Sequence, residues 1–121
     1  MKLLPETIRE IPIFSGLSRE DIDKVIGTME ECSFSAGTII FSQGDRGDTF
    51  YFIESGAVQV LVKGATGRSE TVALLGPYNW FGEKAMLSGE IRSATMLTVK
   101  ETALWKLSRD AWNEIIKPPL S

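Results

Sequence analysis

The N-terminal quarter of the chain carries apolar residues at helical spacing. Residues 4–14 predict a short helical segment that Pro12 interrupts, because proline lacks a backbone N–H and clashes with the preceding turn. Ser18 fits an N-cap, with Asp21 at the capping-box position. The apolar positions that follow at helical spacing are Ile22, Val25, Ile26 and Met29. We therefore expect a helical bundle over residues 1–30, in which one face of the second helix packs on the rest of the domain.

Strand patterns replace the helical pattern over residues 31–107. The segment 58–63 alternates apolar and polar residues with a period of two. Other short apolar runs, separated by turns rich in glycine, lie at 38–41, 50–53, 71–75, 95–99 and 103–107. Short strands with regular turns are typical of a β-sandwich or a β-barrel.

The helical pattern returns at the C-terminal end. Ser108 fits the N-cap of a closing helix over residues 108–117, and Pro118 and Pro119 end it. A chain of 121 residues is long enough for one domain with a real hydrophobic core. We therefore expect a single mainly β domain over 1–121, with helices flanking the strands.

Composition excludes several kinds of function. The formal net charge of −3 argues against a general nucleic-acid binder, which needs a basic face. The chain has no histidine, and Cys32 is its only cysteine, so we expect no metal site and no intrachain disulfide. No apolar run reaches the length of a membrane span, and a single thiol fits a reducing, cytoplasmic compartment.

Candidate chemistry concentrates in the segment 80–95. It reads WFGEKAML over 80–87, and RSAT follows at 92–95. Backbone N–H groups at a helix start bind anions, and the fork of an arginine suits phosphate oxygens. An ionised glutamate only accepts hydrogen bonds, so Glu83 suits a sugar hydroxyl better than a phosphate.

These residues resemble a known family. Gly82, Glu83 and Ala85 together with RSA at 92–94 are similar to the phosphate-binding cassette of cyclic nucleotide-binding domains. The run GDRGDTFYFIESG at 44–56 resembles the second signature of this family, and the resemblance covers about 11–116. The string WFGEKA is most similar to the cassettes of cGMP-dependent protein kinases.

The resemblance implies a fold and a set of ligand-binding residues. The fold is an eight-stranded jelly-roll β-barrel with N-terminal helices, a C-terminal helix and a short helix in the cassette at 81–95. Arg92 would pair with the ligand phosphate, Glu83 would accept from the ribose 2′-OH, and small residues would admit the ligand to backbone N–H groups. The implied binding residues are Gly82, Glu83, Lys84, Ala85, Arg92, Ser93 and Ala94. Gly44, Gly47 and Gly56 fit turns or bulges with an architectural role.

Ser93 carries the question of nucleotide specificity. In this family, cAMP sites commonly place alanine after the arginine, whereas many cGMP sites place a threonine whose hydroxyl bridges the phosphate and the guanine amino group. Ser93 keeps that hydroxyl and therefore favours cGMP, although a small strand residue without base contact is the alternative. Some cGMP sites also carry an arginine on the preceding strand, where this chain has Ala73.

The resemblance implies a regulatory module without catalysis or a cofactor. We expect a cGMP-binding domain cut from a longer cGMP-dependent kinase chain, with the kinase catalytic domain and neighbouring cyclic nucleotide-binding domains as partners. Met86 stands where the family has a hydrophobe that moves with the ligand, and Trp112 fits the core better than a lid over the base. The family's lid normally lies beyond Ile116. The alternatives are a cAMP-binding domain of the same fold and a degenerate docking domain that binds no nucleotide.

Overall fold

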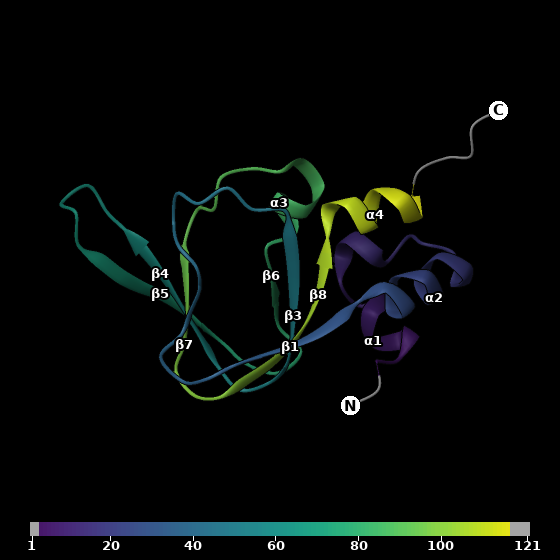
Figure 1. Ribbon diagram of the computed structural model, residues 1–121, viewed down its shortest axis with the longest axis horizontal. Coiled ribbons are helices and arrows are strands. Elements are labelled where there is room, and N and C mark those ends of the chain that lie inside the picture. Colours follow the sequence, from purple (N-terminus) through teal and green to yellow (C-terminus); the bar gives the residue numbers. More distant parts are fainter. Residues whose placement is uncertain (1–2, 117–121) are drawn as a thin grey trace.

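A computed structural model of the chain describes residues 3–116 (Figure 1). The helices are α1 Pro5–Arg9, the 3-10 helix η1 Pro12–Phe14, α2 Arg19–Thr28, α3 Glu83–Ser88 and α4 Arg109–Ile116. The strands are β1 Glu30–Phe34, β2 Ile39–Phe41, β3 Thr49–Ser55, β4 Val58–Lys63, β5 Ser69–Leu75, β6 Trp80–Phe81, β7 Thr95–Thr98 and β8 Thr102–Ser108. This element order confirms the predicted mainly β fold with flanking helices and a short helix between two strands.

The strands form two antiparallel four-stranded sheets, ordered β1-β8-β3-β6 and β2-β7-β4-β5. The predicted eight-stranded jelly roll is confirmed, but its strands do not close into a barrel, because no hydrogen-bonded strand pair joins the two sheets within residues 3–116. Side chains packed between the sheets hold them together instead, and each sheet keeps its edge strands. The jelly roll is therefore an open sandwich of two sheets.

The helices cover only one side of this sandwich. Figure 1 shows α1, α2 and α4 gathered beside the first sheet, whereas the β4–β5 hairpin extends from the opposite end of the molecule. The short helix α3 contacts both β3 and α4. This arrangement places residues 83–88 between the sandwich and the closing helix.

Two predicted N-caps fix the starts of α2 and α4. The backbone N–H of Asp21 donates to Ser18 Oγ at 3.1 Å, and the N–H of Ala111 donates to Ser108 Oγ at 3.2 Å. Each cap satisfies a backbone donor that the helix itself leaves without a partner. The predicted stop at Pro118 and Pro119 lies outside the described residues.

The core has two parts because successive side chains of β3 point to opposite faces of the first sheet. Phe50 and Phe52 face the helices, whereas Tyr51 and Ile53 face the second sheet. Cys32 packs half-buried on the second part, and burial raises the pKa of its thiol. The single cysteine is thus a small, partly buried side chain.

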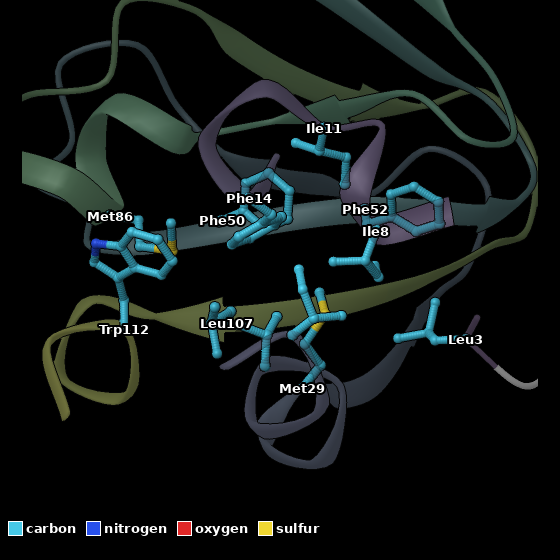
Figure 2. Packing of buried hydrophobic residues seen from close by; sticks show 12 residues of the cluster. Leu3, Ile8, Ile11, Phe14, Met29, Phe50, Phe52, Met86, Leu107 and Trp112 are labelled. Carbon is cyan, nitrogen blue, oxygen red and sulfur yellow. The ribbon is translucent and has the colours of Figure 1, made fainter. Parts of the chain in front are cut away.

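The part of the core beneath the helices also receives residues from α3 and α4 (Figure 2). Met86 is fully buried there, and Trp112 is 6% exposed. Phe14 packs edge-on against Trp112 with a centroid distance of 5.5 Å and against Phe50 at 5.3 Å. Trp112 is therefore a core residue, as expected, and the cassette helix shares this core with the closing helix.

Candidate functional site

A cavity of about 370 Å³ opens between α3, the segment that follows it, and strands of both sheets. Six of the seven predicted site residues line this cavity: Gly82, Glu83, Lys84, Ala85, Arg92 and Ser93. Ala94 does not line it, since its side chain is buried in the core between the sheets.

Arg92 is the dominant charged group in the cavity wall, and only 7% of it is exposed. Its Nη2 donates to the backbone carbonyl of Thr49 at 2.9 Å. Its Nε and Nη1 are buried and have no hydrogen-bond partner. Burial lowers the pKa of Arg92, and nearby Tyr51 and Asp48 act in the opposite direction. A guanidinium stays protonated at neutral pH, so the site holds a desolvated positive charge with spare donors.

Arg92 forms no ion pair with a carboxylate in the part of the chain that the structure describes. The ion pairs there involve residues of α2, and none includes Arg92. The ring of Phe41 instead lies under the guanidinium, with Cζ 3.9 Å from the ring centroid. A buried unpaired cation is costly, so this arrangement is poised for an anion.

Backbone hydrogen bonds join the segment 44–56 to the cassette segment 81–95 at Arg92. The backbone N–H of Arg92 donates to the carbonyl of Asp45, and the N–H of Gly44 donates to the carbonyl of Arg92, both at 2.8 Å. Arg46 and Ile91 form an isolated antiparallel bridge beside these contacts. Residues that lie about 45 positions apart in sequence thus build one wall.

Two glycines leave room for the guanidinium. A Cβ on Gly47 would collide with Nε of Arg92, and a Cβ on Gly82 would lie 2.9 Å from its Nη1. Gly82 also has a φ of +86°, whereas Gly47 has no positive φ. Gly44 and Gly56 adopt positive φ, as expected for turn glycines.

The first turn of α3 supplies the remaining wall. Gly82 is the residue before the helix, and Glu83 begins it, half-buried at the edge of the cavity. The first N–H groups of any α-helix lack partners within the helix, so those of Glu83, Lys84 and Ala85 are available. Lys84 is exposed and adds a second positive charge to the rim.

Sequence reasoning missed two contributors to this site. Phe41 looked like an ordinary apolar strand residue, and nothing local distinguishes a ring under a cation from a ring in the core. Gly47 was given an architectural role, yet it borders the guanidinium directly. Its place within the GDRGD segment was the only signal that could have indicated this.

Comparison with known proteins decides the family. A family model described as "Cyclic nucleotide-binding domain" matches residues 31–118. The chain belongs to this family. The match contains both the GDRGD segment and the whole of α3 with Arg92. The cavity therefore occupies the place where the family's two signatures meet.

Relatives of this domain include a receptor protein and a protein kinase. The chain is 35% identical over 106 residues to the "Cyclic AMP receptor protein" of Thermus thermophilus, covering 88% of this chain and 49% of that protein. It is 30% identical to a cGMP-dependent protein kinase of Drosophila melanogaster, covering 90% of this chain and 12% of the kinase. The chain thus spans half or less of the length of either relative.

Solved structures give the same family. The regulatory domain of Toxoplasma gondii PKA, described as a co-crystal with cAMP, superposes with a TM-score of 0.85 at 33% identity. That match covers 94% of this chain and 43% of the other. Catabolite activator protein of Thermus thermophilus superposes with a TM-score of 0.77 at 35% identity, covering 88% and 50%.

Residues 3–116 contain no group of three or more His, Cys, Asp or Glu side chains placed to hold a metal ion. None of their helices has the length and hydropathy needed to cross a bilayer.

Proposed function

We propose that this domain binds a cyclic nucleotide as a regulatory ligand, with Arg92 holding the cyclic phosphate. The observation that carries the proposal is the buried guanidinium with two unpartnered N–H groups at the cavity wall. Gly82 leaves the space that a phosphate needs beside Nη1, and the first turn of α3 offers backbone donors. The retention of Arg92 and Glu83 argues against a degenerate docking domain.

Glu83 is proposed to accept a hydrogen bond from the ribose 2′-OH. Its carboxylate lines the same cavity as Arg92, where it can accept from a ligand hydroxyl. Glu83→Ala is expected to weaken cGMP binding by about 1.5–3 kcal/mol, the scale of one hydrogen bond to a charged group. The same change should matter much less for 2′-deoxy-cGMP, measured by calorimetric titration. Equal losses for both ligands would mean that Glu83 acts through helix stability.

For the base we propose a preference for guanine through Ser93. Ser93 is exposed and lines the cavity beside Arg92, so its hydroxyl is accessible to a bound ligand. Ala73 faces the core between the sheets from β5, so its methyl group offers no polar contact to a guanine edge. The preference for cGMP would therefore rest mainly on one hydroxyl and be modest.

Binding of cAMP is the second candidate, and the relatives favour it. Besides the Thermus receptor, a cAMP-dependent protein kinase regulatory subunit of Yarrowia lipolytica is 34% identical over 86% of this chain and 26% of that subunit. Side-by-side calorimetric titration with cGMP and cAMP tests the two candidates directly. Failure of both ligands to bind would overturn the proposed function itself.

Substitutions at Ser93 test the base contact separately. Ser93→Ala should lower cGMP affinity by about 0.5–1.5 kcal/mol, one net hydrogen bond, and leave cAMP affinity nearly unchanged. Ser93→Thr should hold or raise the cGMP preference, because the added methyl restricts the rotamer. An equal shift for both nucleotides, or a wild-type preference for cAMP, would place the cAMP candidate first.

We propose that ligand binding at the cassette regulates the protein by changing how α4 packs. Met86 on α3 and Trp112 on α4 share one core, and the N–H of Arg109 at the start of α4 donates to the carbonyl of Asp48 at 2.7 Å. Asp48 adjoins Thr49, whose carbonyl holds Arg92. A ligand that binds two arrangements of these elements with different affinities would shift the equilibrium between them. The coupling free energy of such a step is typically about 1–3 kcal/mol.

The effector controlled by this step is proposed to be the protein kinase of a longer parent chain, located in the cytoplasm. The similarity to a cGMP-dependent kinase and to a PKA regulatory domain supports this context. The similarity to a Thermus receptor protein supports a different effector.

A further inference from the structure

We propose that Phe41 is a positioning residue, whose ring face holds the Arg92 guanidinium in place for an incoming phosphate. The inference rests on the proposed function, because it concerns the same site. The ring centroid lies 3.9 Å from Cζ of Arg92, well inside the roughly 6 Å within which a cation and a ring attract. Phe41 also lines the cavity, so ring, cation and ligand space are contiguous.

Phe41 supplies one of the few direct contacts that stabilise the buried charge of Arg92. The guanidinium has one hydrogen bond, to the Thr49 carbonyl, and no ion pair within residues 3–116. Attraction to a ring face is stronger where water is excluded, and Arg92 is 7% exposed. The ring therefore stabilises a desolvated charge without occupying Nε or Nη1, which stay unpartnered.

The ring itself is fixed by aromatic neighbours from the other sheet. Phe41 lies on β2, and its ring centroid is 5.8 Å from that of Phe81 and 6.2 Å from that of Tyr51. Phe81 and Tyr51 stack on each other at 5.2 Å. Because these contacts bridge the two sheets, the position of the ring depends on the whole sandwich. A guanidinium resting on it is preorganised, which lowers the cost of binding.

The test compares substitutions that keep or remove the ring face. Phe41→Leu keeps an apolar side chain but lacks the ring, and Phe41→Tyr restores a ring face. Phe34→Leu is the matched control, because Phe34 packs half-buried on the same core and has no ring contact with an arginine among the described residues. We expect Phe41→Leu to weaken binding of cGMP or cAMP by about fivefold to thirtyfold, whereas Phe41→Tyr and Phe34→Leu stay near wild type.

A second readout needs no ligand. In ¹⁵N-labelled protein, the buried Nε–H of Arg92 should give a proton signal shifted upfield by the ring beneath it. That shift should vanish in Phe41→Leu, persist in Phe41→Tyr and stay unchanged in Phe34→Leu. An Nε–H signal that does not respond to Phe41→Leu would overturn the inference, whether or not a nucleotide binds.

The two readouts separate this inference from the proposed function. If Arg92→Ala abolishes binding while Phe41→Leu weakens it no more than Phe34→Leu, the positioning role is wrong and the phosphate site stands. If no cyclic nucleotide binds the wild-type domain, the proposed function is wrong, and the Nε–H shift alone decides the ring contact.

Discussion

Arg92→Ala is expected to lower cyclic nucleotide affinity by about 2–5 kcal/mol, because it removes a charge-assisted contact and leaves the ligand phosphate without its buried partner. The unliganded fold should tolerate the change. Arg92 has two unsatisfied buried N–H groups, so removing them offsets the loss of the ring contact and of the bond to Thr49. We expect the free energy of unfolding to change by only about 1 kcal/mol.

The measurement is a calorimetric titration of each protein with cGMP and cAMP, together with urea unfolding without ligand. Arg68→Ala is the control. Arg68 is exposed in the turn between β4 and β5, so this substitution removes the same charge at a place away from the cavity. The control should bind like wild type. Unchanged affinity in Arg92→Ala would remove Arg92 from the site and with it the proposed binding mode.

Elements were predictable where the signal is local. The N-caps at Ser18 and Ser108 depend on residues within one helical turn, and both are present. The alternation at 58–63 likewise predicts β4. The open form of the sandwich could not be predicted in this way, because the pairing of edge strands depends on contacts between segments far apart in sequence.

The site was predictable to the extent that it lies within a motif. Six of the seven predicted site residues line the cavity, and their contacts with a ligand stay a prediction. Phe41 and Arg92 lie 51 positions apart, and the sequence around Phe41 looks the same whether the ring packs on aliphatic side chains or on a cation. Ala94 is a motif position whose side chain is buried in the core between the sheets, and its role toward a ligand stays a prediction.

Gly82→Ala is the second substitution with a large expected effect. Gly82 has a φ of +86°, a conformation that costs a residue with a Cβ about 1–2 kcal/mol. The added Cβ would also lie 2.6 Å from the backbone carbonyl of Thr49, and a backbone atom yields less easily than the end of a side chain. We expect the free energy of unfolding to fall by about 2–5 kcal/mol in total, because overpacking adds a further cost of about 1–3 kcal/mol.

Gly67→Ala is the control that separates the cost of a positive φ from the cost of the steric contacts that a Cβ on Gly82 would make. Gly67 has a nearly equal φ of +81°, in the turn between β4 and β5, and a Cβ there would meet nothing within 4 Å. Gly67→Ala should therefore show only the cost of the backbone conformation in urea unfolding, and it should bind nucleotide normally. Gly82→Ala should lose more stability than this control and also lose affinity, since its Cβ displaces both Thr49 and Nη1 of Arg92. If the two variants prove equally stable and bind equally well, the close approach at Gly82 plays no part in the site, and only its positive φ explains the glycine.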